Sequence, residues 1–310
     1  MGRGDLSDVE WERLRPFLPV SNGRCGRWRD HRQVIDGILH RVRTGVQWRD
    51  LPERFGPWKT VYERHRLWSA DGTWERLLQQ VQATADAAGE IDWDISVDST
   101  IVRAHQHAAG ARNRSVSGPG FKRGRRDGTP GRDAVAEPGR PPGGGGAGGE
   151  GLGRSRGGFT SKLHLSADGR CRPLSLVVIS GQRADCTQFK PVLEKIRVPR
   201  PGRGRPRKKP DSLAADRAYS NGPIRKYLRR RGIRHTIPEK TDSQAARLRK
   251  GARGGRPPAF NEERYKKRNT VERAINRLKQ SRAVATRYDK RGYVFLGTAT
   301  AVAVAIWLRT

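Results

Sequence analysis

The chain of 310 residues has little cysteine, little methionine and few acidic residues: 3 Cys, 1 Met, and 31 Asp and Glu against 64 Lys and Arg. Cys25, Cys171 and Cys186 are widely spaced and form no C-x-x-C pair, which argues against a zinc knuckle and a disulfide framework. Walker and dinucleotide-binding glycine motifs are also missing, so ATP or dinucleotide use is not supported. A reducing cytoplasm fits this composition.

Long apolar runs are almost absent as well. Residues 292–308 (GYVFLGTATAVAVAIWL) form the one membrane candidate, and these 17 residues fall short of the roughly 20 that a spanning helix needs. Gly297, Thr298 and Thr300 dilute the run further. The start, MGRGDLSDVEW, lacks the apolar stretch of a secretory signal. We therefore predict a buried core helix over 292–308 and no membrane partner.

Positive charge is what the sequence has in excess. The formal net charge is +33 and the isoelectric point is about 11.4. Such a chain repels itself unless a polyanion neutralises it, which indicates nucleic acid as the partner. A basic ribosome-associated protein is the other interpretation, and it too is a nucleic-acid interpretation.

Residues 1–90 are predicted to be helical. Ser7-x-x-Glu10 is a capping-box pattern, and residues 30–44 place apolar side chains at helical spacing before Gly45. Further helices fit residues 59–68 and 73–88. Short helices rich in Arg and Trp favour a DNA-binding domain of the helix-turn-helix type. A plain helical bundle remains open, because spacing alone identifies no recognition helix.

Residues 91–310 change to a strand pattern and predict a mixed α/β sheet flanked by helices. Helices are expected over 185–196, 223–231 and 263–282, and strands over 94–102, 159–167, 173–180, 212–216 and 234–237. Residues 113–157 are dominated by Gly, Pro and Arg and are predicted to be a flexible insert. Residues 198–211 and 239–262 are predicted to be basic loops.

Three acids are unusual for their positions. Asp98 and Asp216 each follow an apolar strand pattern, and Glu272 lies in a segment where, from residue 201 onward, 30 Lys and Arg face 8 Asp and Glu. Carboxylates in such a setting need a counter-charge, and a divalent cation such as Mg²⁺ supplies one. Each acid also has an ordinary explanation: a turn cap for Asp98 or Asp216, and a helical pair with Arg268 for Glu272.

The predicted helix around Glu272 carries more information. On a continuous helix, Tyr265, Arg268, Glu272 and Lys279 share a stripe about 60° wide. An apolar face lies beside this stripe, formed by Val271, Ala274, Ile275 and Leu278. The arrangement indicates one carboxylate for a metal ion, with Arg268 and Lys279 placed to hold phosphates.

These residues match Y-x2-R-x3-E-x6-K, and the chain thereby resembles bacterial insertion-sequence transposases of the DDE class, specifically the IS-five branch. Six further segments resemble that branch, in order: WRDLPERFGPWKTVYERHRLW, VDSTIVRAHQHAAGAR, GRSRGGFTSKLHL, LAADRAYS, IPEK and the closing RYDK. The resemblance spans nearly the whole chain. The insert 113–157 departs from it, being longer than expected, and could reflect a reading-frame scar.

The resemblance implies an RNase H-like catalytic domain in which Asp98, Asp216 and Glu272 are catalytic metal ligands for Mg²⁺, with Mn²⁺ able to replace it. It implies a transposase that binds terminal inverted repeats, cleaves DNA and joins the ends to a target by in-line transesterification. It also implies double-stranded DNA as the partner and a homodimer or larger synaptic complex as the assembly. The expected location is the bacterial cytoplasm, in association with the nucleoid. The alternatives are an RNase H-like nuclease without strand transfer and an inactive DNA-binding copy that acts as a repressor.

The DNA-binding residues expected are Tyr265, Arg268 and Lys279 of the stripe, with Arg103 of the Asp98 motif. Arg203 and Arg205 belong to an R-G-R-P sequence that resembles an AT-hook core, and we interpret it as an unspecific phosphate-binding linker. His105 and His107 alternate as a metal-binding pair would, but no further ligand lies nearby in the sequence. We interpret them as DNA-facing or structural residues.

Overall fold

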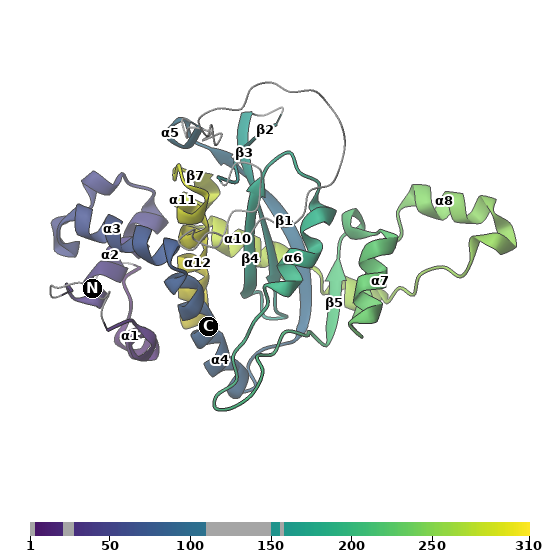
Figure 1. Cartoon of the computed structure of the whole chain (residues 1–310), viewed down its shortest axis with the longest axis horizontal. Coiled ribbons are helices and arrows are strands. Elements are labelled where there is room, and N and C mark those ends of the chain that lie inside the picture. Colours follow the sequence, from purple (N-terminus) through teal and green to yellow (C-terminus); the bar gives the residue numbers. More distant parts are fainter. Residues whose placement is uncertain (1–3, 21–27, 110–149, 156–157) are drawn as a thin grey trace, which may run out of the picture.

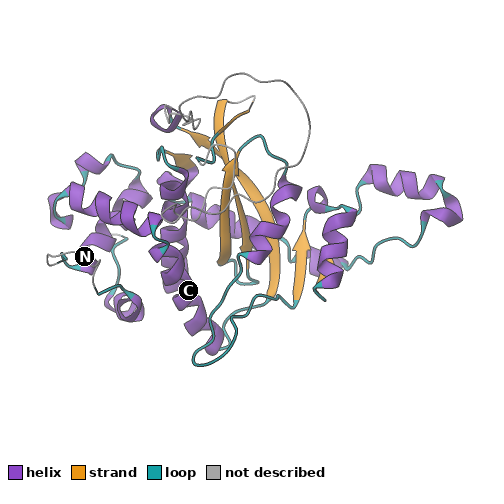
Figure 2. Ribbon diagram, in the orientation of Figure 1, coloured by secondary structure: helices purple, strands orange, loops and turns teal. Residues whose placement is uncertain are grey.

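The computed structural model describes residues 4–20, 28–109, 150–155 and 158–310. Most of the predicted insert, and Cys25, lie outside the described residues. The described part combines a helical N-terminal region with a seven-stranded mixed sheet (Figures 1 and 2). The mixed α/β class predicted for residues 91–310 is therefore confirmed.

The N-terminal helices begin and end close to their predicted positions. Ser7 and Glu10 form the reciprocal capping box that opens the first helix. Asp30 caps the second helix, which ends at Gly45 in the left-handed conformation (φ 73°) that glycine adopts without strain. The α-helices in the described part of this region are α1 (Asp8–Leu14), α2 (His31–Thr44), α3 (Trp58–Ala70) and α4 (Thr73–Ala87).

The sheet is built around its longest strand, β1 (Asp94–Ala104). β1 pairs antiparallel with β3 (Gly158–Ala167) and parallel with β5 (Ser212–Ala215), and β5 pairs parallel with β6 (Arg234–Thr236). Three shorter pairings complete the sheet: β4 (Pro173–Ser180) and β2 (Gly153–Ser155) on β3, and β7 (Thr286–Arg287) on β1.

Side chains alternate between the two faces of this sheet. Ser96 of β1 receives a hydrogen bond from Thr270 of α10 (Asn269–Lys279), so the even-numbered residues of β1 near it face α10. Ser99 faces the other side, where its hydroxyl donates to Asp185 just before α6 (Phe189–Glu194). Asp98 is therefore directed toward α10.

The helix predicted over 292–308 is observed as α12 (Gly292–Leu308), and it is buried along nearly its whole length. α12 lies between the N-terminal helices and the sheet (Figure 1) and contacts α3, α4 and β4. At Gly297 the two backbones approach so closely that an added Cβ would lie 2.0 Å from Ser69 Oγ of α3. Within the described residues, no helix is long and apolar enough to cross a membrane.

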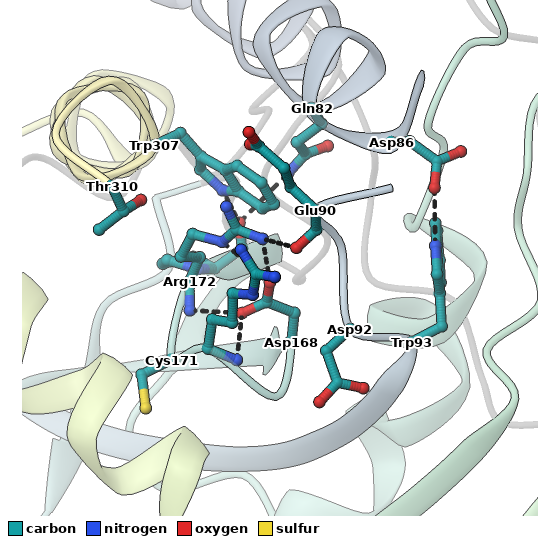
Figure 3. A network of polar contacts seen from close by, with 12 residues as sticks. Gln82, Asp86, Glu90, Asp92, Trp93, Asp168, Cys171, Arg172, Trp307 and Thr310 are labelled. Carbon is teal, nitrogen blue, oxygen red and sulfur yellow. Dashed lines mark hydrogen bonds and ion pairs between the residues drawn. The ribbon is translucent and has the colours of Figure 1, made fainter. Parts of the chain in front are cut away.

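The turn between β3 and β4 contains a buried ion pair and contacts α12 through Trp307 (Figure 3). Arg172 donates from Nη2 to Asp168 Oδ2 at 2.7 Å, and both side chains are almost completely buried. The guanidinium lies 3.9 Å from the ring centre of Trp307, whose indole donates to the Pro173 carbonyl. Gln82 of α4 donates to the same carbonyl, so α4, α12 and the sheet meet at one point.

Two segments that were predicted to be loops contain regular structure. Residues 153–155, placed inside the insert, form β2. The predicted basic loop 239–262 contains helix α8 (Thr241–Arg249), which has no buried residue and projects from the body (Figure 1). The remaining connecting helices are α5 (Gln106–Ala109), α7 (Gly222–Arg230), α9 (Glu262–Lys266) and α11 (Arg282–Ala285).

The prediction of one continuous helix over 263–282 is wrong. The chain forms α9 and α10 with a tight turn at Lys267 and Arg268, where hydrogen bonds join residues three apart instead of four. Asn269 and Thr270, both weak helix formers, follow the turn. The apolar face of α10 is nonetheless as predicted, because Val271, Ala274, Ile275 and Leu278 are all buried.

Candidate active site

Asp98 on β1 and Asp216, the residue directly after β5, lie side by side at neighbouring parallel strands. Val97 of β1 is in register with Ala215 of β5, and the two aspartates come next along each strand. Adjacent strands are about 4.8 Å apart, so these two carboxylates belong to one site. Asp216 also caps the following turn, since its Oδ1 accepts from the Arg217 amide at 2.5 Å.

Glu272 reaches the same site from the first turn of α10. Arg268 joins it to Asp98: the guanidinium donates from Nη2 to Glu272 Oε1 at 2.5 Å and from Nη1 to Asp98 Oδ2 at 3.3 Å. The helical pair expected between Arg268 and Glu272 is therefore present. One cationic group spans two of the three predicted acids, although 174 positions separate those acids in the sequence.

The electrostatics of Asp98 reflect this crowding. Burial raises the pKa of Asp98 to about 6, the Ser99 amide and Arg268 oppose the shift, and the charges of Asp216 and Glu272 add to it. Burial alone would lower the pKa of Arg268, but the hydrogen bond to Glu272 leaves that pKa raised overall. Three carboxylates thus share one region with a single bridging guanidinium.

The donor chemistry of this region suits a hard divalent cation, because carboxylate oxygens are the ligands that Mg²⁺ prefers. Among the described residues, no three His, Cys, Asp or Glu side chains stand in an arrangement that would hold an ion. Arg268 lies where positive charge is needed, between Asp98 and Glu272. The guanidinium is thus ion-paired with both carboxylates.

The other predicted DNA-binding residues divide into two groups. Tyr265 lies beside the site, with the Arg268 guanidinium 5.7 Å from its ring centre. Lys279 donates to the Ile101 carbonyl at 3.2 Å, and Arg103 is exposed further along β1. Arg203 and Arg205 are exposed in the loop that precedes β5, at the opposite end of that strand from Asp216.

His105 and His107 lie beyond the end of β1. Their rings are 4.5 Å apart, and His105 is 5.0 Å from the ring of Tyr288. They do not alternate along one strand, because β1 ends at Ala104 and His107 belongs to α5. The structure places both rings in an aromatic cluster away from the three acids.

A polar cluster behind Asp98 was missed by sequence reasoning. Asp185 Oδ1 accepts from Ser99 Oγ at 2.7 Å and from Lys162 Nζ at 3.0 Å. The hydrogen bonds from Ser99 and Lys162 outweigh burial and lower the pKa of Asp185. Tyr219 is buried nearby, where burial and the carboxylates of Asp98 and Asp185 raise the pKa of its phenol. No spacing in the sequence links Asp185 to Ser99, since they meet only when the segment after β4 packs against β1.

Two models of known protein families match this chain. Residues 91–305 match the model of the transposase DDE domain family, and residues 6–78 match a family described as a putative transposase of the IS4/5 family. No solved structure matches the chain.

Three curated relatives are similar over about a third of the chain. An uncharacterized protein, y4sN, of Sinorhizobium fredii is 43% identical over 108 residues, which are 34% of this chain and 82% of the relative. An uncharacterized 16.2 kDa protein of insertion element IS402 from Burkholderia cepacia is 36% identical over 112 residues, which are 34% of this chain and 76% of the relative.

The third relative, named as a putative transposase for insertion sequence element IS402 of Burkholderia cepacia, is 32% identical over 28% of this chain and 42% of its own length. The transposase DDE model covers well over half of the present chain, and it includes all three acids that the sheet and α10 gather. The chain belongs to the DDE-domain transposases of insertion sequences.

Proposed function

We propose that this chain binds the terminal inverted repeats of its element, cleaves the DNA strands there and transfers the free 3′ ends to a target. The observation that carries this proposal is the meeting of Asp98 and Glu272 on one guanidinium, with Asp216 at the end of the strand beside Asp98. The strand order β4-β3-β1-β5-β6, with β1 antiparallel to β3 and parallel to β5, supports an RNase H-like fold for this domain.

Asp98, Asp216 and Glu272 would hold the metal, for which Mg²⁺ is the natural choice and Mn²⁺ a substitute. When bound, divalent ions activate the attacking oxygen and stabilise the leaving oxygen of a phosphodiester. Arg268 would then exchange its carboxylate partners for phosphate oxygens, which its planar fork fits equally well. Its half-buried position lets it make that exchange without leaving the site.

The remaining residues of the predicted stripe would position the DNA. Lys279 lies along β1 from Asp98 and offers an ammonium donor, and burial lowers the pKa of that ammonium. Tyr265 would pack against DNA beside Arg268. Because two ends must be held together for transfer, we expect a homodimer or larger synaptic complex on double-stranded DNA.

The test is the Asp98→Ala variant in a plasmid excision assay with Mg²⁺. Strand cleavage should fall by about three orders of magnitude or more, because several kcal/mol of transition-state stabilisation are lost. Binding to terminal-repeat DNA should stay close to that of the unaltered protein. Glu263→Ala is the matched control, since Glu263 is an exposed acid on α9 and should leave cleavage unchanged.

Cleavage that persists in Asp98→Ala would contradict the assignment of this residue. An integration assay separates the proposal from an RNase H-like nuclease without strand transfer, because only a transposase joins donor ends to a target plasmid. A copy acting as a repressor would bind the ends without metal-dependent nicking. Short inverted repeats flanking the coding region would identify the DNA to use.

A further inference from the structure

The two oxygens of the Asp98 carboxylate are held by different partners. Oδ1 accepts a hydrogen bond from the Ser99 amide at 2.8 Å, and Oδ2 accepts one from Arg268 Nη1 at 3.3 Å. In the proposed function Arg268 turns to phosphate oxygens, which leaves Oδ2 free for a metal ion. Among the described residues, the Ser99 amide is then the group that still fixes the direction of this carboxylate.

Ser99 is itself anchored on the opposite face of the sheet. Successive side chains of a strand point to opposite faces, so Ser99 faces away from α10 when Asp98 faces toward it. Its hydroxyl donates to Asp185 Oδ1 at 2.7 Å. Asp185 begins the short 3₁₀ helix that follows β4. The amide and the hydroxyl of one residue thus connect the carboxylate of Asp98 with that of Asp185.

Asp185 is also held by the strand next to β1. Lys162 of β3, which lies opposite Ile101 in the sheet register, places its ammonium 3.0 Å from Asp185 Oδ1. The same ammonium donates to the Arg183 carbonyl at 2.8 Å. Lys162 therefore fixes both the carboxylate of Asp185 and the backbone two residues before it.

The charge of Asp185 is permanent near neutral pH. Burial alone would raise its pKa, but the hydrogen bonds from Ser99 and Lys162 leave that pKa lowered. An ionised carboxylate accepts a stronger hydrogen bond than a neutral group does. The pair with Lys162 is largely buried, the two side chains being 29% and 13% exposed, and such a pair adds little net stability. Attachment of the segment to the sheet therefore does not by itself account for it.

The same segment borders the backbone that carries Asp216. Tyr219 donates its amide to the Asp216 carbonyl at 3.0 Å, and its buried ring packs 5.4 Å from the ring of Phe189 in α6. The residues after β4 thus contact the ends of both strands that bear the aspartates. They lie on the face of the sheet opposite α10, where they leave the metal side of the site open.

We propose that Asp185 is a positioning residue, which acts through Ser99 to hold the Asp98 carboxylate in the direction needed to bind a divalent ion. The inference rests on the proposed function, because that function makes Asp98 a metal ligand. Asp185 itself contacts neither the ion nor DNA in this role. Groups that hydrogen-bond to metal-binding side chains typically account for about 10–100-fold in metal affinity.

The experiment measures Mg²⁺ binding without DNA, so that cleavage plays no part. Thermal denaturation of the unaltered protein, Ser99→Ala and Asp185→Ala is followed over a Mg²⁺ titration, and the rise of the midpoint gives an apparent dissociation constant. This constant should be about tenfold higher in both variants. In a cleavage assay both should need correspondingly more Mg²⁺ for half of their maximal rate, and saturating Mg²⁺ should restore most of the rate because Asp98 is still present.

Two further variants serve as controls. Ser99→Thr keeps a hydroxyl on the strand and should keep the Mg²⁺ affinity of the unaltered protein. Thr187→Val removes a hydroxyl of the segment after β4 that donates to the Ala184 carbonyl, and it should also leave this affinity unchanged.

The outcomes separate this inference from the proposed function. A purely structural role would lower the denaturation midpoint of Ser99→Ala and Asp185→Ala in EDTA but leave their Mg²⁺ dissociation constants unaltered, and that result would overturn the inference alone. If Asp185→Ala does not fold, Ser99→Ala decides by the same criterion. Unchanged Mg²⁺ affinity in Asp98→Ala, or no response of the unaltered protein to Mg²⁺, would overturn the proposed function itself.

Discussion

Two arginine–carboxylate clusters in this molecule use the same chemistry in opposite ways. Arg172 and Asp168 are 1% and 0% exposed, and Asp168 also accepts hydrogen bonds from the Arg170 and Arg172 amides. Arg268 and Glu272 are 19% and 46% exposed, and Asp98 shares the same guanidinium at a longer distance. The first cluster is closed under Trp307 (Figure 3), whereas the second is open to solvent.

This difference in exposure distinguishes an ion pair that stabilises the fold from an ion pair whose cation another cation can replace. A fully buried pair is costly to break, because the remaining charge has no water to solvate it. A half-exposed group of one cation and two acids can release its cation when another arrives. Neither cluster is distinguished by its residue types, so burial and the number of competing partners decide which role each plays.

Breaking the closed cluster of Arg172 and Asp168 should have the largest effect on the free energy of unfolding. Arg172→Met leaves Asp168 buried without its counter-charge and should lower the free energy of unfolding by about 3–5 kcal/mol. Urea denaturation followed by circular dichroism measures this change. Addition of Mg²⁺ should not restore the loss, since Asp168 is closed off from solvent. A loss below about 1 kcal/mol would show that the pair is not structural.

The second test concerns the unfavourable charge of Asp98. Its folded pKa, about 6, lies above the ordinary value of 3.8, so the folded chain binds more protons than the unfolded chain between these values. In EDTA its contribution to stability should therefore fall as pH rises from about 4 to 6 and stay constant above. Asp98→Asn should remove this dependence and raise stability at pH 7 by on the order of 2 kcal/mol.

Denaturation midpoints of the unaltered protein and of Asp98→Asn, measured at pH 4.5 and pH 7, test this pH dependence of stability. Asp94→Asn, which alters another acid of the same strand, serves as the control and should keep the pH dependence of the unaltered protein. Identical pH profiles for Asp98→Asn and the unaltered protein would rule out the raised pKa of Asp98.

Substitution of Arg268 should have the smallest effect on stability. Arg268→Met removes a half-exposed pair and should cost about 1 kcal/mol in EDTA. Millimolar Mg²⁺ should recover most of that loss, because a divalent cation can take the position of the guanidinium. Thermal denaturation with and without Mg²⁺ gives the comparison. A loss unaffected by Mg²⁺, as expected for Arg172→Met, would remove the contrast between the clusters.

Local chemistry explains which parts of the fold were predictable. Ser7, Asp30 and Gly45 fix helix ends through their own hydrogen bonds or backbone freedom, and the capping box and both ends of α2 were correctly predicted. The burial of α12 followed from its composition. By contrast, the turn at Arg268 lies directly before Thr270, which donates a hydrogen bond to Ser96 of β1, and no helical periodicity contains that long-range contact.

For the candidate site, too, local sequence signals were predictable and long-range contacts were not. Asp98, Asp216 and Glu272 could be selected from strand ends and a sequence signature, and the structure brings them into one region; their roles stay predictions. The pairing of Asp185 with Ser99 depends on how the segment after β4 packs against β1, and the cavity lined by Trp48, Tyr62 and Tyr288 gathers four separate segments. Contacts between such distant segments arise only when the chain folds, so neither could be found by reading along it.

The position of α12 has a consequence for biosynthesis. This helix leaves the ribosome after both the N-terminal helices and nearly all of the sheet, yet it packs against both. Until it arrives, the apolar sides of α3, α4 and β4 have no cover, and a nascent chain with exposed apolar surface is prone to aggregate. We expect chaperones to bind the nascent chain most strongly in that interval. A ribosome stalled before residue 292 should therefore hold a chain in which both the N-terminal helices and the sheet still expose the surfaces that α12 covers.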